Sequence, residues 1–461
     1  MTLIRSISGI RGTIGGKPGE GLSPLDAVRY ASAYARWVVE SHPDRRPVVV
    51  VGRDARLSGP MLMPLVVQTL RMSGVDVIDA GLSTTPTVEM GVVFEGAQGG
   101  IIMTASHNPR QWNALKLLNH QGEFISAAEG AQILAWAEAD DFHYADVDGL
   151  GSLRTADDLL DRHIEAILAL DWVDRDAIAN ADFKVAVDAV NSSGGIAVPA
   201  LLRALGVQRI EEIHCEPHGE FAHNPEPLQA HLGDLLSHTA QTGCDLGIAV
   251  DPDVDRLALV TEQGVLFGEE YTLVACADYV LSQEKGPAVS NLSSSRALSD
   301  VCAQHGVGYF ASAVGEVHVV EQMKKVGAVI GGEGNGGVIV PRLHYGRDAL
   351  VGIALFLTHL AKSGQRCSEL RARYPEYAMS KQKIELNPGA DASAFLQKAA
   401  LAFANERLTT VDGVKVDFSE GWVHLRASNT EPIVRIYAEA PTLERAEQFV
   451  DRVRQAISTE S

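Results

Sequence analysis

The feature that most constrains this chain is the alternation of short apolar runs with longer amphipathic segments. Residues 47–52 (PVVVVG) are typical of a buried strand, and residues 58–73, which follow them, repeat apolar side chains at helical spacing. Strands that alternate with helices in this way predict parallel sheets with right-handed crossover connections. The same reasoning predicts further strands at 75–80, 99–104, 183–189, 209–214, 246–250 and 287–292, and further helices at 24–40, 193–205 and 269–283.

The last fifth of the chain follows a different order. Two predicted strands at 422–426 and 433–440 lie next to each other, and residues 442–457 then carry apolar side chains on one helical face. A length of 461 residues is typical of three or four domains. The most plausible divisions fall near residues 150, 256 and 368.

The charge balance narrows the class of partner. Asp and Glu number 59 against 39 Lys and Arg, so the formal net charge is −20. We expect no binding to nucleic acid or to an anionic membrane, because both would repel such a chain. A local basic pocket could still bind a phosphorylated small molecule.

The spacing of the cysteines and the lengths of the apolar runs indicate the cellular compartment. The number of cysteines is odd, and no pair has CxxC spacing, which argues against a disulfide framework or a zinc ribbon and fits a reducing cytoplasm. The N-terminal sequence MTLIRSISGIRG lacks the apolar core of a signal peptide, and no stretch approaches the roughly 18–20 apolar residues of a membrane helix. We therefore expect a cytoplasmic protein.

Four loops carry residues suited to chemistry, and the first is 104–109 (TASHNP). It follows a predicted strand directly, and side chains at the carboxyl end of a parallel strand usually face a ligand. Ser106 beside His107 suggests an activated hydroxyl, although the side chains of adjacent residues usually diverge. A polar turn closed by Asn-Pro would give the same pattern, and no GxSxG elbow is present to indicate a hydrolase triad.

The second loop, 251–256 (DPDVDR), places three carboxylates at alternate positions. Such charges repel one another unless a cation lies among them, and oxygen ligands suit Mg²⁺. A calcium EF-hand matches poorly because its sixth position, here Arg256, requires glycine. The aspartyl loop of haloacid-dehalogenase-type phosphatases normally has Thr or Val where this chain has Asp255. A solvated acidic turn also remains open.

The third and fourth loops suit a sugar and a phosphate. Residues 331–337 (GGEGNGG) let a ligand approach the backbone closely, and Glu333 and Asn335 could bind hydroxyls. Residues 426–432 (RASNTEP), with Arg435 just beyond, combine arginines, hydroxyls and an amide that could hold a phosphate dianion. Taken singly, each loop could also be an ordinary turn.

Together, and with residues 8–12 (SGIRG), these loops closely resemble the motifs of the α-D-phosphohexomutases. TASHNP resembles the family's phosphoserine loop, DPDVDR its metal loop, GEGNGG its sugar-binding loop and RASNTEP its phosphate-binding loop. The resemblance implies an α/β fold of four domains around a central cleft, three of them similar mixed α/β sandwiches and the last a smaller α+β domain. The implied domains are 1–150 (phosphoserine), 151–256 (metal), 257–368 (sugar) and 369–461 (phosphate).

The resemblance also implies an activity. Family members are isomerases that interconvert hexose 6-phosphates and hexose 1-phosphates. The phosphoserine donates its phosphate to the sugar, and the enzyme then takes the other phosphate back from the bisphosphorylated intermediate. Mg²⁺, an activator such as glucose 1,6-bisphosphate, a small sugar phosphate as partner, and a monomer or homodimer are implied as well.

The family's functional residues map onto this sequence in three sets. The resemblance makes Ser106 the phosphorylated nucleophile and places Mg²⁺ on Ser106, Asp251, Asp253 and Asp255. It makes Arg11 and Arg256 stabilise the transferring phosphoryl group, and Lys116 or His107 carry the proton. It assigns substrate binding to Glu333, Asn335, Arg426, Ser428, Asn429, Thr430 and Arg435.

The chain departs from the family pattern at Pro252 and Val254, which stand where glycines are usual in the metal loop, and at Asn335 and Gly337, where Ser and His are common. The third loop and residues 314–319 (VGEVHV) resemble archaeal and some bacterial phosphoglucosamine mutases. Glucosamine 6-phosphate is therefore the implied substrate, and Glu316 could meet its amino group.

Three alternatives stay open. The first is a phosphomannomutase/phosphoglucomutase. The second is a Mg²⁺-dependent sugar-phosphate phosphatase with Asp251 as its nucleophile. The third is a non-catalytic protein that binds a metal or a sugar phosphate.

Overall fold

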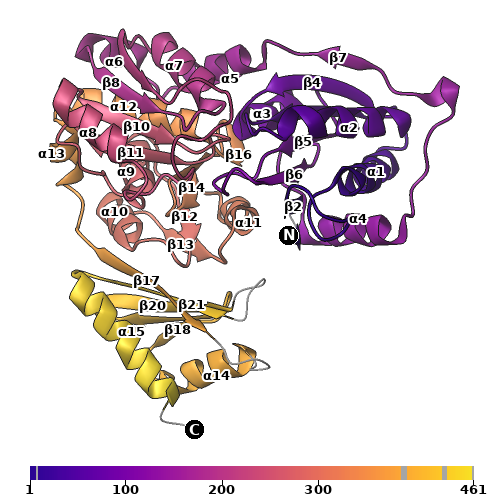
Figure 1. Cartoon of the computed structure of the whole chain (residues 1–461). Coiled ribbons are helices and arrows are strands. Elements are labelled where there is room, and N and C mark those ends of the chain that lie inside the picture. The colour runs from indigo at the N-terminus through magenta and orange to yellow at the C-terminus, as the bar shows by residue number, and fades with distance from the viewer. Residues whose placement is uncertain (7–8, 386–391, 428–432, 459–461) are drawn as a thin grey trace.

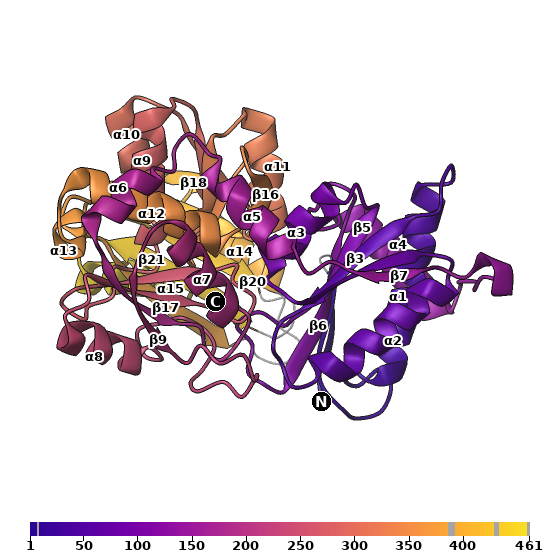
Figure 2. The same ribbon diagram turned by 90° about the horizontal axis from the view of Figure 1, so that it is seen from above.

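The structure has four domains, each built on one sheet (Figure 1). It is a computed structural model that describes residues 1–6, 9–385, 392–427 and 433–458. The expected four-domain α/β fold is confirmed. Figure 1 shows domain 1 on one side, domains 2 and 3 together on the other, and domain 4 below domain 3; Figure 2 shows the same arrangement from above. Among the described helices, none has both the length and the apolar character that a membrane crossing requires.

Domain 1 contains a seven-stranded sheet in the order β1-β2-β6-β5-β3-β4-β7. Its strands are β1 (Leu3–Ser6), β2 (Gly9–Thr13), β3 (Val48–Arg53), β4 (Asp76–Leu82), β5 (Gly99–Met103), β6 (Trp112–Leu118) and β7 (Leu153–Thr155). Its helices are α1 (Pro24–Ser41), α2 (Gly59–Met72), α3 (Thr85–Phe94) and α4 (Ala127–Ala139), with a 3-10 turn at η1 (Val147–Gly149).

Domains 2 and 3 contain sheets of four and five strands, in the orders β11-β10-β8-β9 and β13-β12-β14-β15-β16. The elements of domain 2 are α5 (Leu159–Leu168), α6 (Arg175–Ala181), β8 (Lys184–Asp188), α7 (Gly194–Ala204), β9 (Arg209–Ile213), α8 (Gly233–Thr242), β10 (Leu246–Val250) and β11 (Leu257–Thr261). Those of domain 3 are α9 (Tyr271–Gln283), β12 (Ala288–Asn291), α10 (Ala297–His305), β13 (Tyr309–Ser312), α11 (Glu316–Val326), β14 (Ile330–Glu333), β15 (Gly337–Val340), β16 (His344–Arg347), α12 (Ala349–Ser363) and α13 (Cys367–Arg371).

These three sheets share one motif that no sequence repeat had indicated. In each, three neighbouring strands are parallel (β4-β3-β5, β9-β8-β10 and β13-β12-β14), and an antiparallel strand follows the third. The antiparallel strands are β6, β11 and β15. The first, second and third chemistry-bearing loops all connect the last parallel strand to this antiparallel one, so they occupy equivalent places in the three domains.

Domain 4 has a five-stranded antiparallel sheet in the order β17-β21-β20-β19-β18. Its elements are β17 (Ala378–Glu385), α14 (Ala392–Ala402), β18 (Arg407–Thr409), β19 (Val414–Phe418), β20 (Gly421–Ala427), β21 (Ile433–Ala440) and α15 (Leu443–Ser458). The amphipathic α15 packs its apolar side on the sheet through Phe449, Val450 and Val453, as the sequence pattern predicts.

Local sequence signals predicted the ends of most helices and strands to within one or two residues of those in the structure. Ser23 caps α1, since its side chain accepts from the Asp26 amide while the Asp26 carboxylate accepts from the Ser23 amide. The third loop is shorter than expected, because β14 and β15 extend into it and leave only residues 334–336 as the turn.

Two expected domain divisions fall inside sheets. β7, beyond residue 150, is parallel to β4, and β11, beyond Arg256, pairs with β10 over five residues. A division at either point would separate hydrogen-bonded strands. We therefore propose that domain 1 extends through β7 and domain 2 through β11.

Domains 2 and 3 are joined by a common apolar core. Residues 349–360 of α12 are all buried, and the helix contacts α6 of domain 2 as well as α9 of domain 3. One continuous cluster of buried side chains runs from Ile164 to Tyr374. Burial of apolar surface on this scale fixes the two domains relative to each other.

Domain 4 meets domain 3 mainly through polar contacts. His424 Nδ1 lies 2.8 Å from Ser293 Oγ, and the Val314 amide donates to Asp412 Oδ2 at 2.9 Å. The apolar core of domain 4 is a separate cluster. Polar interfaces of this kind usually permit relative domain motion.

The stability of this interface should depend on pH through His424. Burial lowers the pKa of the ring from 6.5 to about 4. Between these values the unfolded chain binds a proton that the folded chain does not, so the unfolding free energy should fall by up to about 3 kcal/mol as the pH decreases from 6.5 to 4. Amide hydrogen exchange of β19 and β20, corrected for the intrinsic effect of pH, measures this loss.

His424→Gln should remove this part of the pH dependence. The exposed His143 of domain 1 provides the matched control, since His143→Gln should leave the slope unchanged. Equal slopes in the wild type and His424→Gln would contradict the prediction.

Candidate functional site

A cleft of about 940 Å³ lies where the four domains meet. It is lined by side chains from each of them, which include nine of the residues named from the sequence: Arg11, Ser106, His107, Lys116, Arg256, Glu333, Asn335, Arg426 and Arg435. Residues that lie more than 400 positions apart in the chain therefore reach one cavity. Ser428, Asn429 and Thr430 lie outside the described residues.

Ser106 lines the cleft in an unusual backbone conformation. Its φ is 49°, in the left-handed region that residues other than glycine seldom adopt. Its Oγ donates to Asp251 Oδ2 at 2.7 Å and lies 3.2 Å from His107 Nδ1. The expectation that adjacent Ser and His side chains diverge is wrong here, because the left-handed turn brings the two together.

A buried arginine fixes the shape of the serine loop. The Arg56 guanidinium donates to the carbonyl oxygens of Ser106, Asn108, Pro109 and Trp112, and its Nε donates to Asp54 Oδ2 at 3.0 Å. Asp54 Oδ2 also accepts from the Thr104 hydroxyl at 2.6 Å. Both charges are fully buried, and each is satisfied by the other and by the loop, which leaves the loop little freedom.

The three aspartates of the second loop form a buried cluster. One carboxylate oxygen of each lies within 4.8 Å of those of the other two. Within the described residues, Asp253 Oδ1 and Asp255 Oδ1 are buried and accept no hydrogen bond. Burial, reinforced by the charges of Asp255 and Asp253, holds the pKa of Asp251 well above its usual range. A set of oxygen ligands with buried, unpaired oxygens fits Mg²⁺.

Val254 lies between two of these aspartates and adopts a left-handed φ of 64°. Such a conformation costs a β-branched residue about 1–3 kcal/mol, and glycine would adopt it freely. The side chain is fully buried in the core shared by domains 2 and 3, where packing compensates. The departure from glycine at this position thus preserves the turn.

Two cations, one from domain 1 and one from domain 3, pair with these aspartates. Lys116 of domain 1 donates to Asp253 Oδ2 at 2.6 Å and to Asp255 Oδ2 at 3.3 Å. Arg347 of domain 3 donates to Asp255 Oδ2 at 2.7 Å. Burial disfavours the charged form of Lys116, but the two carboxylates more than offset this effect and raise its pKa. Thr85 adds a hydrogen bond to Asp253 Oδ2 at 2.6 Å.

Two arginines line the same cleft as Ser106 and act on its neighbour His107. Arg11 donates to Asn108 Oδ1 at 2.7 Å, and Arg256 lies 3.6 Å from Glu226 Oε1. Burial, followed by the charges of Arg256 and Arg11, lowers the pKa of His107 to about 2, so its ring is neutral at physiological pH. The surroundings therefore favour an anion beside Ser106.

The carboxylates that domain 3 contributes to the cleft are already paired. Glu333 accepts from Asn291 Nδ2 at 2.8 Å and from Arg347 Nη1 at 3.0 Å. Both oxygens of Glu316 accept from Arg347, at its amide and at its Nε. Glu316 lines the cleft, but its charge partner is Arg347, which counts against the idea that it meets a substrate amino group. Asn335 Oδ1 accepts from the Gly337 amide at 3.2 Å.

Domain 4 presents a row of cations to the cleft. Arg426 and Arg435 are direct neighbours across β20 and β21, and both line the cleft together with Lys381 of β17. Directly opposed residues point to the same face of a sheet. Asp412 Oδ2 pairs with Arg426 Nε at 2.7 Å and offsets only part of this charge. Like charges in a row favour an anion between them.

Sequence reasoning missed three residues of this site: Arg56, Thr85 and Arg347. Each lies just beyond a strand or at its end, on the edge of a sheet that carries a chemistry-bearing loop. Arg347 belongs to a Gly-Arg-Asp segment shortly after the glycine loop, which was a usable signal. Nothing local distinguished Thr85, because its role depends on a contact with residue 253 of another domain.

Family models match the chain along nearly its whole length. They are described as phosphoglucomutase/phosphomannomutase alpha/beta/alpha domain I (residues 3–144), domain II (161–264), domain III (268–377) and the C-terminal domain (379–456). The four matches occur in the same order as the four sheets.

Individual relatives agree with these matches. A phosphoglucomutase/phosphomannomutase of Thermococcus kodakarensis is 35% identical over 446 residues, which cover 95% of this chain and 96% of the relative. A probable phosphoglucosamine mutase of Methanopyrus kandleri is 33% identical and covers 98% and 97%. The crystal structure of a phosphoglucomutase/phosphomannomutase family protein from Burkholderia thailandensis superposes with a TM-score of 0.85 at 27% identity, over 99% and 98% of the two chains. The chain is therefore a member of the α-D-phosphohexomutase family of isomerases.

Proposed function

We propose that this protein interconverts hexose 6-phosphate and hexose 1-phosphate through a phosphorylated Ser106. The observation that carries the proposal is the position of the Ser106 hydroxyl, 2.7 Å from Asp251, in the lining of a cleft to which all four domains contribute. Positive side chains from domains 1 and 2 surround it. Phosphoryl transfer depends chiefly on positioning and on charge neutralisation, and the cleft supplies both.

Asp251, Asp253 and Asp255, with an oxygen of Ser106, would hold Mg²⁺, which when bound neutralises charge on a transferring phosphoryl group. The protein supplies the remaining functions. Arg11 and Arg256 would stabilise the developing negative charge from the cleft side. Arg56 keeps the serine loop in its left-handed turn, so the hydroxyl is oriented before substrate arrives.

The proton has two candidate carriers. His107 Nδ1 lies 3.2 Å from Ser106 Oγ, but its lowered pKa makes the ring a weak base, and the hydroxyl already donates to Asp251. Lys116 is held by two of the aspartates and would act on a substrate hydroxyl above them. Both side chains line the cleft, and we favour Lys116 for the substrate proton because its raised pKa keeps it protonated and able to donate.

The phosphate that does not react would bind domain 4, between Arg426 and Arg435. A fixed phosphate site can serve either end of the sugar, so one cradle suffices for both half-reactions. Because domain 4 meets domain 3 through polar contacts, its closure over the substrate would exclude water and protect the phosphoserine from hydrolysis. A sugar bisphosphate such as glucose 1,6-bisphosphate would load Ser106 initially.

Glucosamine 6-phosphate is the substrate we propose first, on the strength of the glycine loop, residues 314–319 and the 33% identity to the relative from Methanopyrus kandleri. A phosphoglucomutase or phosphomannomutase activity is the second candidate. It is favoured by the 35% identity to the Thermococcus kodakarensis relative and by the engagement of Glu316 with Arg347.

One experiment decides the function and the sugar together. The purified protein, with Mg²⁺ and a trace of glucose 1,6-bisphosphate, would be given the 1-phosphates of glucosamine, glucose and mannose in separate reactions. Peptide mass mapping of the same samples would locate phosphate. Turnover with phosphate on Ser106 is the expected result, and no turnover with an unmodified serine would overturn the proposal.

Ser106→Ala should reduce mutase activity by at least about 1,000-fold, because no other group can hold the transferred phosphate. Coupled assays of 6-phosphate formation measure the loss. Ser41→Ala, at the exposed end of α1, is the matched control and should retain activity. If Ser106→Ala kept its activity while Asp251→Asn lost it, a phosphatase with an aspartyl nucleophile would be the better description.

Arg435→Gln should lower kcat/KM by about 10- to 150-fold, because one charge-assisted hydrogen bond to the phosphate is worth about 1.5–3 kcal/mol. Steady-state kinetics with the 1-phosphate measures the change. Arg445→Gln offers the control within domain 4, since Arg445 pairs with Glu420 on the surface. An equal effect of the two substitutions would argue against a phosphate site at Arg435.

A further inference from the structure

Domain 2 contributes a loop to the cleft that has no role in the steps proposed above. Residues 214–232 connect β9 to α8, and Glu226 and Leu228 of this loop line the cleft together with Arg256. The sequence of residues 224–227 (NPEP) places a proline on each side of Glu226. Proline fixes its own φ and restricts the residue before it, so the backbone that carries Glu226 is stiff.

Glu226 pairs with one of the two arginines proposed to stabilise the transferring phosphoryl group. Its Oε1 lies 3.6 Å from Arg256 Nη1, whereas Asp255 Oδ1 lies 3.9 Å from Arg256 Nε. Arg256 Nε is buried and has no hydrogen-bond partner within the described part of the chain. Because so few contacts fix the guanidinium, its direction in the cleft depends on the ion pair with Glu226.

The same loop packs against the arginine that holds the serine loop. The centre of the Phe221 ring lies 5.1 Å from Cζ of Arg56. Gly219 approaches the backbone of Ala55 closely, since a Cβ at this glycine would lie 1.9 Å from the Ala55 carbonyl oxygen. The loop of domain 2 therefore contacts domain 1 directly beside the support of Ser106.

One histidine fastens this loop to the sheet of domain 2. His223 Nε2 lies 3.0 Å from Oδ2 and 3.1 Å from Oδ1 of Asp188, the last residue of β8. His223 Nδ1 lies 2.8 Å from the carbonyl oxygen of Asn224. Carboxylate and carbonyl oxygens only accept hydrogen bonds, so the ring satisfies both partners only when each of its nitrogens carries a proton. His223 and Asp188 thus form a charge-assisted pair.

The groups around His223 favour the charged ring. Asp188 is 1% exposed, and its Oδ1 also accepts from the Val190 amide at 3.0 Å. The His214 ring meets His223 edge to face, with 5.7 Å between the ring centres, and it pairs in turn with Asp234 at 3.1 Å. Burial disfavours the charged form of His223, but the hydrogen bond and the charge of Asp188 more than offset this effect and raise its pKa.

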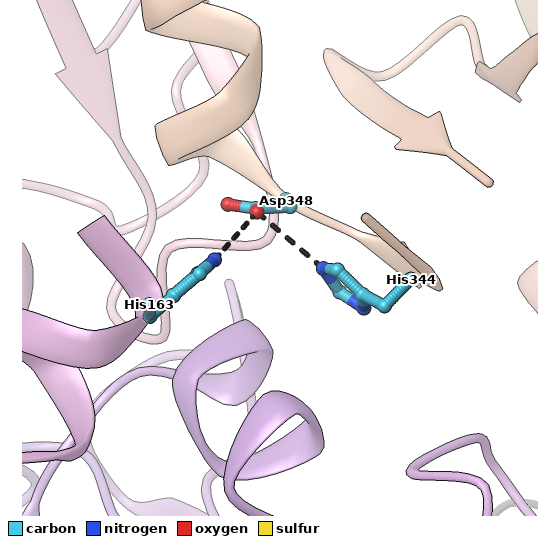
Figure 3. Close-up of side chains that lie close together, drawn as sticks. All are labelled: His163, His344 and Asp348. Carbon is cyan, nitrogen blue, oxygen red and sulfur yellow. Dashed lines mark hydrogen bonds and ion pairs between the residues drawn. The ribbon is translucent and has the colours of Figure 1, made fainter. Parts of the chain in front are cut away.

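A buried network elsewhere in the molecule uses histidine and aspartate in the same way (Figure 3). His163 Nε2 of α5 and His344 Nε2 of β16 lie 3.0 and 3.4 Å from Oδ2 of Asp348, which precedes α12. These hydrogen-bonded ion pairs join domains 2 and 3, and the described lining of the cleft includes none of the three residues. The His223–Asp188 pair differs in that it fastens a loop that lines the cleft.

We propose that His223 is a positioning residue, which acts on phosphoryl transfer through Glu226 and Arg256; this inference rests on the proposed mutase function. The His223–Asp188 pair fixes residues 219–228 on domain 2, and Glu226 then directs the Arg256 guanidinium. The loop supplies no reacting group. Its contribution is to hold Arg256 in the direction required when negative charge develops on the phosphoryl group.

A double-mutant cycle tests this series of contacts. Glu226→Gln and His223→Gln should each lower kcat by about 10- to 100-fold with little change in KM, because Arg256 loses its direction in the transition state. The double variant should lose no more activity than His223→Gln alone, since both changes remove the same effect. If the two residues acted independently, for example through stability alone, their fold-losses would multiply.

Two variants of domain 2 serve as matched controls. Glu220→Gln alters an exposed carboxylate of the same loop, and His238→Gln alters a histidine that lies 3.7 Å from Glu211. Both should keep the kcat of the wild type. Glu226→Gln leaves the His223–Asp188 pair intact, so it tests the effect on Arg256 even if His223→Gln does not fold. Glu226→Asp, which retains the charge, should recover part of the lost kcat.

The outcomes separate this inference from the proposed function. Turnover by the wild type with an unchanged kcat in Glu226→Gln would overturn the positioning role and leave the mutase function standing. Multiplied losses in the double variant would overturn the role as well. No turnover by the wild type, with Ser106 unmodified after treatment with glucose 1,6-bisphosphate, would overturn both proposals.

Discussion

Opposite charges held out of water between three domains set the architecture of this protein. Lys116 of domain 1 and Arg347 of domain 3 both donate to Asp255 of domain 2. Breaking such a buried pair costs about 3–5 kcal/mol, so none of these groups is satisfied unless all three domains are in place. Asp253 and Asp255 each keep one buried oxygen that accepts no hydrogen bond from a described residue, so the contacts that join the three domains also shape the aspartate cluster.

The way the domains pack together divides the molecule into a rigid part and a part that could move. Domains 2 and 3 share one apolar core around α12, and the ion network attaches domain 1 to them. Domain 4 keeps its own core and meets domain 3 through contacts such as Ser293 with His424. The serine, aspartate and glycine loops are therefore located on domains 1 to 3, and Arg426 and Arg435 are carried by the domain that keeps a separate core.

Three domains place different chemistry at one equivalent position. The loops that carry Ser106, the three aspartates and Glu333 all follow the third parallel strand of their sheets, where the antiparallel strand begins. At this point the chain turns back into an antiparallel strand. The ends of the parallel strands therefore present backbone and side-chain groups to a shared cavity. Ser106, Asp251 and Glu333 thus occupy corresponding sites, although the sequence shows no repeat between them.

The sequence by itself determined the elements and the chemistry-bearing loops. Apolar periodicity and the Ser23 cap are local features, so the bounds of α1, β3 and β10 could be predicted closely. The spacing of the three aspartates favoured a cation site. Only the tertiary structure decided which distant groups meet. The contact of Arg56 with the serine loop, that of Arg347 with three carboxylates, and that of His163 with Asp348 could not be predicted from the sequence. Their roles depend on packing between segments up to 185 residues apart, and short-range patterns carry no information on such distances.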